Sequence, residues 1–528
     1  MHSTQTSTTV EVGVGPVSFD DLVRVARDGA PVALTDEALA AVDHARDVIE
    51  ALASGETPTY GVSTGFGALA TRHIPTEMRA QLQRSLVRSH AAGSGPEVER
   101  EVVRALMLLR LSTLATGRTG VRRETAQLMA DLLSHGITPV VREYGSLGCS
   151  GDLAPLSHCA LALMGEGEVR DASGTLVPAA EALAAAGLAP VELAAKEGLA
   201  LINGTDGMLG MLVLAITDLR MLLRTADVAA AMSVEAQLGT DRVFAPELQA
   251  IRPHPGQALS AANLTALMAD SAVVASHRTG SGNTVECNRV QDAYSLRCSP
   301  QVHGAARDTV EHAALVAGRE LASAIDNPVV LAHPDGSGTV ESNGNFHGAP
   351  VAYVLDFLAI VAADVASISE RRTDRFLDRA RSHGLPPFLA DDPGVDSGLM
   401  IAQYTQAAIV SELKRLAVPA SVDSIPSSAM QEDHVSMGWS AARKLRRSVD
   451  GLSRVVAVEV LTAARALDLR APLTPSPATG AVVALLRESG IDGPGPDRHL
   501  SPEIEAAVGL VQSGAVLAAA EGVVGPLS

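Results

Sequence analysis

One short segment carries most of the information in this sequence: Gly145-Ser146-Leu147-Gly148-Cys149-Ser150-Gly151-Asp152-Leu153-Ala154-Pro155-Leu156. Its first half is rich in glycine and predicts a loop, because glycine adopts backbone conformations that other residues avoid. Its second half predicts a helix that begins at Asp152, a residue type favoured at the N-cap, with Pro155 in the first turn and Gly165 at the end. Residues 137–144 are expected to be extended, because Pro139 excludes an ordinary helix.

Helical periodicity dominates the chain on both sides of this segment. Amphipathic helices are expected within residues 96–117 and 128–136. Longer and more apolar helical stretches follow at 199–223, 351–371, 399–416 and 434–469. These stretches are too apolar on all sides for the surface of a single subunit, so we expect a buried bundle or subunit interfaces. Residues 274–300 form the one long irregular segment that the sequence predicts.

The composition also favours helices. Hydrophobic residues make up 47% of the 528 residues and aromatic residues only 2%, so Ala, Leu and Val must fill the core. Sheets rely more on aromatic and β-branched side chains than helices do. We therefore expect a mainly α fold.

Charge and cysteine content exclude several classes of function. The 41 basic and 60 acidic residues give a formal net charge of −19, and such an acidic surface repels phosphate backbones, so we expect no nucleic-acid partner. The cysteines form no CxxC pair and no short-spaced set with histidine, so we expect no metal site and a reducing compartment. Residues 1–9 lack the features of a signal peptide, and the apolar runs are far short of the ~20 residues of a membrane span. We therefore expect a soluble, cytoplasmic protein that does not enter a membrane.

Taken alone, the loop allows other interpretations. Residues 148–151 could form a simple tight turn before a helix, since short motif matches are only hypotheses. Ser150 could be the nucleophile of a serine hydrolase. The G-x-S-x-G elbow is not met, however, because Asp152 stands where its second glycine belongs, and a helix-rich chain is a poor match to the strand-turn-helix setting of that elbow.

Further motifs lie along the chain: Tyr60-Gly61-Val62-Ser63-Thr64-Gly65-Phe66-Gly67, Ser89-His90-Ala91-Ala92-Gly93, Leu201-Ile202-Asn203-Gly204-Thr205-Asp206-Gly207, Gln291-Asp292-Ala293-Tyr294-Ser295-Leu296-Arg297-Cys298, Asn343-Gly344-Asn345-Phe346-His347-Gly348 and Met430-Gln431-Glu432-Asp433-His434-Val435. The glycines of the first motif do not indicate nucleotide binding, because the Gly-Lys-Ser/Thr ending and the G-x-G-x-x-G spacing are missing. Taken singly, Tyr60 is typical of a core residue, His90 of a structural hydrogen bonder and Glu432 of a solvated charge cluster or a helix start.

Together, these motifs resemble the signature of the ammonia-lyases and aminomutases that use a methylidene-imidazolone (MIO) prosthetic group. The family includes histidine, phenylalanine and tyrosine ammonia-lyases. The resemblance implies that Cys149, Ser150 and Gly151 form the group without an external cofactor. The Gly151 amide nitrogen attacks the Cys149 carbonyl carbon, two water molecules leave, and Ser150 becomes an electron-poor alkene. The family usually has Ala in place of Cys149, and the ring needs only the backbone there, so we expect it to form.

The resemblance also implies roles for residues of the other motifs. Tyr60 matches the catalytic base. Arg297 matches the anchor of the substrate carboxylate, which a guanidinium grips with two parallel hydrogen bonds. Asn203 matches a residue that contacts the carboxylate and the prosthetic group. Further matching residues line the site, and they are Gln291, Tyr294, which is the second candidate for the base, and Phe346. Residues 277–288 depart most from the family pattern, and Met430 stands where Asn is common.

Two positions imply the substrate. The Ser89-His90 pair looks like the histidine type, whereas phenylalanine-specific relatives carry apolar residues there. Glu432 matches a carboxylate that faces the imidazole, where aromatic-acid lyases carry Gln. The implied reaction converts L-histidine to trans-urocanate plus ammonia, and the resemblance is to the actinobacterial type. The alternatives are an aromatic amino-acid lyase or aminomutase within the family, and a serine hydrolase or an inactive helical scaffold outside it.

The family architecture implies a globular N-terminal part that carries the MIO loop and a long central helical bundle. On the sequence, we expect these to span residues 1–220 and 221–471, followed by a linker at 472–480 and a helical cap within 472–528. The resemblance further implies a homotetramer whose sites mix residues of several subunits.

Overall fold

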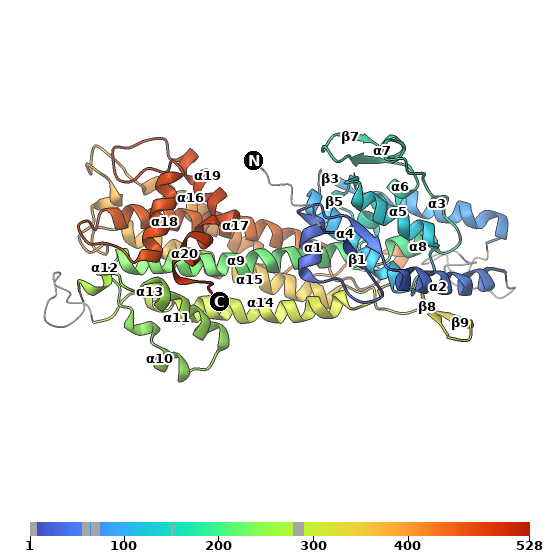
Figure 1. Ribbon diagram of the computed structural model, residues 1–528, viewed down its shortest axis with the longest axis horizontal. Helices are drawn as coiled ribbons and strands as arrows, with labels where there is room; N and C mark the ends of the chain where they lie inside the picture. Colours follow the sequence, from blue (N-terminus) through green and yellow to red (C-terminus); the bar gives the residue numbers. More distant parts are fainter. Residues whose placement is uncertain (1–7, 55–63, 65–73, 149–150, 278–289) are drawn as a thin grey trace. The chain divides into compact units, whose positions relative to one another are not determined.

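The computed structural model describes residues 8–54, 64, 74–148, 151–277 and 290–528 (Figure 1). The chain is mainly helical, as predicted, and it divides into two compact units. The first unit comprises Met1–Leu214, Ala314–Asp356 and Pro419–Arg443, and the second comprises Ala215–Ala313, Phe357–Val418 and Lys444–Ser528. The expected division at residues 220 and 471 stays a prediction.

The first unit combines short helices with small sheets. Its helices are α1 (Phe19–Ala26), α2 (Asp36–Ser54), η2 (Thr76–Met78), α3 (Arg79–His90), α4 (Arg100–Ala115), α5 (Arg123–Ser134), α6 (Leu153–Leu163), α7 (Ala179–Ala185), α8 (Glu197–Ile202) and η5 (Ser428–Met430). Its strands are β1 (Val10–Val12), β2 (Val32–Leu34), β3 (Ser94–Glu97), β4 (Thr138–Pro139), β5 (Arg142–Tyr144), β6 (Glu168–Arg170), β7 (Leu176–Pro178), β8 (Val329–Ala332) and β9 (Gly338–Glu341). Strands β1 and β2 pair in parallel, and the pairs β3–β5, β4–β6, β6–β7 and β8–β9 are antiparallel.

Helix α4 forms the core of the first unit. Almost all of its side chains are buried, including two arginines, Arg104 and Arg110. Helix α5 covers α4 and ends as expected, with Gly136 in a left-handed conformation just beyond it. The sequence placed Pro96 at the start of α4, and this was wrong. Pro96 lies in β3, which pairs with β5, and the helix begins at Arg100.

The boundary between the units falls within the long helices α9 (Asp206–Ala236), α14 (Ser299–Leu321), α15 (Ala349–Leu377) and α17 (Gly438–Asp468). The second unit also contains η3 (Arg242–Phe244), α10 (Pro246–Ala250), α11 (Pro255–Leu267), α12 (Ala272–Ala275), α13 (Tyr294–Arg297), η4 (Pro387–Leu389), α16 (Met400–Leu416), α18 (Pro477–Glu488), α19 (Ser501–Gln512) and α20 (Ala515–Val524). Figure 1 labels the α-helices of this set, from green α9 to red α19, but not η3 and η4.

The predicted helical bundle is present in the second unit. Its buried polar centre is Glu459 of α17, which accepts hydrogen bonds from Ser233 of α9 at 2.7 Å and from Ser369 of α15 at 2.6 Å. Arg372 of α15 pairs with the same carboxylate at 2.9 Å. Both charges are fully buried and are paired with each other, so removing either side chain alone would leave the other as an uncompensated buried charge, which is strongly destabilising.

Two further expectations about helices need correction. Residues 199–223 are not one helix, since the chain breaks between α8 and α9. The linker expected at 472–480 is shorter, because α18 starts at Pro477 with Ser476 as its N-cap, and Ser476 Oγ accepts a hydrogen bond from the Thr479 amide. The described part of the irregular segment 274–300 contains α13 and the start of α14.

One helix is apolar enough to resemble a membrane span. Among the described residues, α15 passes the criteria of length and composition, and 67% of its most apolar window is buried within the structure. The bent pair α19 and α20 passes only when both are taken together, across an angle of 59°. Core helices of globular proteins meet the same criteria, and the burial of α15 is typical of them.

Candidate active site

The glycine-rich loop is held by backbone contacts just before residues 149–150, which lie outside the described residues. Gly148 has a φ of +72°, as expected from a glycine in a tight loop. Its carbonyl accepts hydrogen bonds from Ser436 Oγ at 2.6 Å and from the Gly348 amide at 3.1 Å. The residues that follow Phe346 and Glu432 in the chain therefore both contact the loop through hydrogen bonds to Gly148.

Gly151, on the other side of the pair, packs on the backbone of Gly204. The two residues form a parallel β-bridge, and the Asp152 amide donates to the Gly204 carbonyl at 2.6 Å. A Cβ at Gly151 would overlap that carbonyl, and its φ of +72° disfavours L side chains, so only glycine fits here. The ring implied by the sequence needs a bent residue without a side chain at this place, and the backbone fits that requirement.

Asp152 occupies the N-cap position of α6, but its carboxylate does not cap that helix. It accepts hydrogen bonds from the Gly207 and Met208 amides of α9, each at 2.9 Å, and from Ser146 Oγ at 2.8 Å. The expectation of a side-chain cap on α6 was therefore wrong. The first turn of α9 also has amides without intrahelical partners, and the Asp152 side chain reaches those. Burial raises the pKa of Asp152 to about 7 despite these hydrogen bonds.

Asn203 lies at the break between α8 and α9 and is 3% exposed. Its Nδ2 donates to the Asn327 carbonyl at 2.8 Å. Its Oδ1 is buried and finds no hydrogen-bond partner in the described part of the chain. A buried amide oxygen without a partner costs free energy unless a ligand or a bound group satisfies it, so this atom marks a binding position.

His90 and Glu432 are close enough to interact. His90 ends α3, and its Nδ1 lies 2.9 Å from the Leu86 carbonyl, which fixes the proton on Nδ1 and leaves Nε2 as an acceptor. Burial lowers the pKa of His90, while the hydrogen bond to Leu86 and the Glu432 carboxylate oppose this shift. Glu432 Oε2 accepts from Ser427 Oγ at 3.0 Å. The structure thus places His90 and Glu432 near each other, and their predicted role in reading the imidazole of the substrate stays a prediction.

Phe346 lies between β9 and α15 and is half-buried. Its neighbour His347 stacks on His434, with ring centroids 5.4 Å apart and with ring nitrogens 3.3 Å apart. The motifs that contain Phe346 and Glu432 are therefore in direct contact. The sequence analysis assigned no role to either histidine.

Gln291, Tyr294 and Arg297 form a second cluster at the start of α13. Arg297 Nη2 donates to Gln291 Oε1 at 3.0 Å, and its Nε donates to the Asp292 carbonyl at 3.0 Å. The guanidinium lies 4.7 Å from the centre of the Tyr294 ring, which is 72% exposed. The cluster offers a cation and a phenol toward solvent.

The predicted site residues therefore fall into two groups. The first unit holds His90, Gly151, Asn203, Phe346 and Glu432, and the second holds Gln291, Tyr294 and Arg297. Tyr60, Cys149 and Ser150 belong to the first unit by sequence and lie outside the described residues.

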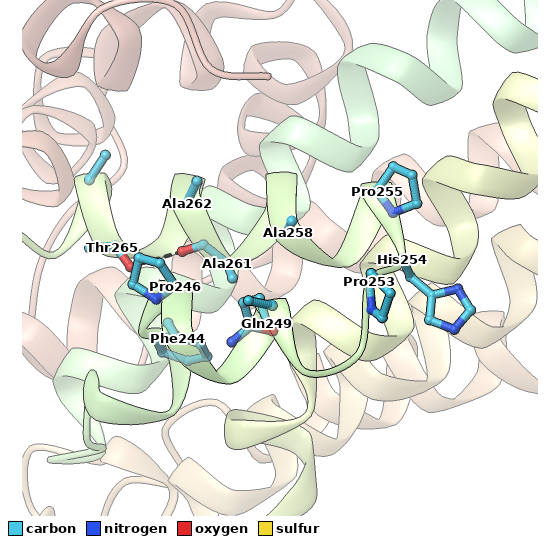
Figure 2. A pocket seen from close by; sticks show the side chains of 12 residues that line it. Phe244, Pro246, Gln249, Pro253, His254, Pro255, Ala258, Ala261, Ala262 and Thr265 are labelled. Atoms are coloured by element: carbon cyan, nitrogen blue, oxygen red, sulfur yellow. Dashed lines mark hydrogen bonds between the residues drawn. The ribbon is translucent and has the colours of Figure 1, made fainter.

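One apolar cavity has no place in this chemistry. It has a volume of about 590 Å³ and lies in the second unit, between α11 and the segment of η3 and α10 (Figure 2). Its lining residues are Phe244, Pro246, Gln249, Ala250, Pro253, His254, Pro255, Ala258, Ala261, Ala262, Thr265 and Ala266. Only His254 among them has an ionisable side chain, and none is a predicted site residue, so geometry and chemistry favour the two groups above.

Among the described residues, no group of three or more His, Cys, Asp and Glu side chains could hold a metal ion. One contact at the site was not predicted. Arg110 of α4 contacts the Asn203 carbonyl at 2.7 Å, although it lies about ninety positions earlier in the chain. In the sequence Arg110 is only a charged residue within an apolar helix, and the contact is tertiary.

Comparison with known proteins agrees with this geometry. A family model described as aromatic amino acid lyase matches residues 17–488. The chain is 67% identical over 519 residues to a histidine ammonia-lyase of Streptomyces coelicolor, covering 98% of this chain and 99% of that one. It is 68% identical over 522 residues to that of Streptomyces griseus, covering 98% and 100%. Among solved structures, a histidine ammonia-lyase from Trypanosoma cruzi matches with a TM-score of 0.88 at 38% identity, covering 98% and 95%. A tyrosine aminomutase from Streptomyces globisporus matches with a TM-score of 0.90 at 37% identity, covering 97% and 98%.

The family model and the relatives define a carbon–nitrogen lyase. The chain belongs to the aromatic amino acid lyase family, which is the MIO-dependent group of ammonia-lyases and aminomutases. Its similarity to the histidine ammonia-lyases of Streptomyces confirms the resemblance seen in the motifs. The serine hydrolase alternative is not supported by this family.

Proposed function

We propose that this enzyme converts L-histidine to trans-urocanate and ammonia. The observation that carries the proposal is the placement of His90 and the Glu432 carboxylate within interaction range of each other, in the unit that holds the glycine-rich loop. His90 Nδ1 is engaged with the Leu86 carbonyl, so the two side chains offer one neutral and one charged acceptor to a substrate ring. A histidine imidazole brings N–H donors to such acceptors, whereas the phenyl ring of an aromatic substrate brings none.

The electrophile in this proposal is the MIO group, formed by Cys149, Ser150 and Gly151. Support comes from the backbone of Gly151, where only glycine fits, and from the buried Asn203 Oδ1, which needs a partner. When present, the group supplies an electron-poor alkene to which the substrate amine adds, so that a poor leaving group becomes a good one. The contacts at Gly148 and Gly204 hold the ends of the triplet and so favour closure of the ring.

The side-chain pocket recognises the imidazole. His90 Nε2 accepts a hydrogen bond from one imidazole N–H, because its own proton is engaged with Leu86. The Glu432 carboxylate accepts from the second N–H of the ring when the imidazole of the substrate is protonated, while Ser427 holds one of its oxygens. Charge-assisted bonds of this kind are the stronger ones. Phe346 packs nearby and limits the space for the ring.

The other end of the substrate is bound by its carboxylate. Arg297 grips it in two-pronged fashion with help from Asn203, while Gln291 orients the guanidinium at 3.0 Å. This fixes the β-carbon against the base, Tyr60, which removes a β-proton. Tyr294, stacked on Arg297, is the second candidate for that base.

We further propose that the enzyme is cytoplasmic and forms a homotetramer whose active sites are shared between subunits. The second unit exposes large apolar side chains on neighbouring turns of α15 and α16, which are Phe357 (45%), Ile360 (47%), Ile401 (58%) and Tyr404 (59%). Exposed apolar surface of this kind is typical of subunit interfaces. The described cysteines, Cys159 and Cys298, are free, as in a reducing compartment.

The direct test follows urocanate in the near ultraviolet while the purified protein is incubated with L-histidine, and with L-tyrosine and L-phenylalanine in parallel. Intact-mass measurement of the same sample should show the loss of two waters, whereas the Ser150→Ala protein should keep its full mass and be inactive. Faster turnover of L-tyrosine would favour the aromatic alternative. Full activity at unmodified mass would refute the electrophile.

A further inference from the structure

The break between α8 and α9 is the element that presents Asn203 to the site. Helix α8 ends at Ile202 and α9 begins at Asp206, so the carbonyls at the end of α8 have no partners within that helix. The Asn203 side chain is held separately, by the Asn327 carbonyl at 2.8 Å. The position of the amide thus depends on two backbone segments, the helix break and the residues before Asn327.

A single guanidinium ties these two segments together. Arg110 Nη1 donates to the Asn203 carbonyl at 2.7 Å and to the Ala200 carbonyl at 3.3 Å. Arg110 Nη2 donates to the Ile325 carbonyl at 2.8 Å, two residues before Asn327. Arg110 therefore holds the backbone of Asn203 directly. It also holds the segment that leads to Asn327, whose carbonyl binds the Asn203 side chain.

The positive charge of Arg110 lies near a carboxylate at the break between α8 and α9. Its side chain is fully buried, and its Nε lies 3.6 Å from the carboxylate of Asp206, the first residue of α9. The planar fork of a guanidinium can serve three carbonyls and one carboxylate at once, whereas an ammonium presents a single point of charge. Gly204 has no side chain where this fork passes, and a Cβ there would lie 2.9 Å from Nη1 and Nη2.

We propose that Arg110 is a positioning residue of the reaction, which acts through Asn203. This inference rests on the proposed role of Asn203 in binding the substrate carboxylate. Arg110 touches neither substrate nor prosthetic group, and its effect on turnover is transmitted by the orientation of the Asn203 amide.

Helix α4 itself supplies a matched control. Arg104 is also fully buried, and it donates to the Val25 carbonyl at 2.8 Å and to the Leu133 carbonyl at 3.0 Å. Neither acceptor is a predicted site residue. Arg104→Lys thus measures how far kcat/KM falls when a buried arginine on the same helix is replaced and the contacts of Asn203 are kept.

The test is a double-mutant cycle on kcat/KM for L-histidine, with each protein corrected for its content of cyclised chain by intact mass. Arg110→Lys is expected to lower kcat/KM at least tenfold more than Arg104→Lys at a comparable melting temperature. In the Asn203→Ala background, Arg110→Lys should change kcat/KM by less than about threefold, because the residue through which it acts is gone.

Equal losses from Arg110→Lys in both backgrounds would overturn the proposal. Arg110→Gln, which keeps one donor and removes the charge, serves if the lysine variant does not fold. Failure of both to fold, while Arg104→Lys and Arg104→Gln fold, would show that Arg110 is structural and would also overturn it. Wild-type protein that is cyclised but inactive on L-histidine refutes the proposed function instead, so the two failures are distinguishable.

Discussion

Substrate choice at the residue scale depends on the charge of Glu432. Glu432→Gln keeps the shape of the side chain and an oxygen that can still accept from Ser427. It replaces a charge-assisted hydrogen bond to the imidazole by a neutral one, a change on the order of 1.5–3 kcal/mol in a dry site. We expect kcat/KM for L-histidine to fall by roughly tenfold to a hundredfold, measured by initial rates of urocanate formation.

The same variant should lower any residual turnover of L-phenylalanine and L-tyrosine far less, because a phenyl ring has no donor for Glu432 and a phenol O–H is not charged. This difference between substrates is the control. A parallel loss on all three amino acids would mean that Glu432 supports the fold of the site rather than recognition of the imidazole.

The proton acceptor is predicted to be Tyr60, and Tyr60→Phe removes only its hydroxyl. Ring packing and the loss of two waters at Ser150 should both survive, whereas the rate should fall by roughly 10²–10⁴-fold. A free phenol has a pKa of about 10, so turnover of the wild-type protein should rise from neutral toward alkaline pH as the phenolate forms. Steady-state rates between pH 7 and pH 10 measure both effects.

Inhibitor binding distinguishes the proposed role of Tyr60 from that of Arg297, the carboxylate anchor. A competitive inhibitor that keeps the α-carboxylate should bind Tyr60→Phe as it binds the wild-type protein, and it should bind Arg297→Lys more weakly, since lysine lacks the two-pronged grip. Activity of cyclised Tyr60→Phe within a few-fold of the wild type would move the base to Tyr294.

At the scale of elements, the Asp152 side chain links the glycine-rich loop to α9, and its effect on the free energy of unfolding depends on pH. Burial raises the pKa of this carboxyl to about 7 in the folded chain, from the ordinary aspartate value of 3.8. Between these values the folded chain holds a proton that the unfolded chain has lost, so stability falls as pH rises through this window. The full penalty, up to about 4 kcal/mol, is reached above pH 7.

Asp152→Asn should remove this dependence. Its amide oxygen can still accept from the Gly207 and Met208 amides, and it carries no charge to desolvate. We expect the melting temperature of the variant, relative to wild type, to increase between pH 5 and pH 8. A constant difference between the two proteins across that range would contradict the raised pKa.

The same helices show which parts of the fold could be predicted from the sequence. Periodicity predicted the helices that became α5, α15 and α16, because each has a continuous apolar pattern. It predicted one helix across residues 199–223, although Asn203-Gly204-Thr205-Asp206-Gly207 is a polar, glycine-rich interruption typical of a turn. At this break Gly204 pairs with Gly151. Asp152 was placed correctly at the N-cap of α6. The bond from the Gly207 amide of α9 to the Asp152 carboxylate could not be predicted, because the two residues lie 55 positions apart in the chain.

For the whole molecule, the motifs predict the site residues but not which chain supplies them. His90 and Glu432 could be paired from the family resemblance, and the structure brings them together within one unit. Gln291, Tyr294 and Arg297 form their own cluster in the other unit, and Tyr294 is 72% exposed. A substrate-binding cluster that is open to solvent in one chain is expected to be completed by another chain.

Complementation between two inactive variants tests this expectation. Ser150→Ala chains cannot form the electrophile, and Arg297→Ala chains cannot anchor the carboxylate, so each homo-oligomer should be inactive. If one site takes Ser150 from one subunit and Arg297 from another, oligomers co-assembled from equal amounts of the two chains regain activity. Random mixing then makes about a quarter of the sites intact, because each site needs both positions from the right partner. The measurement is urocanate formation by co-expressed, doubly tagged oligomers, with the two homo-oligomers mixed after assembly as the control. Co-assembled oligomers as inactive as that control would place both residues of a site in one chain.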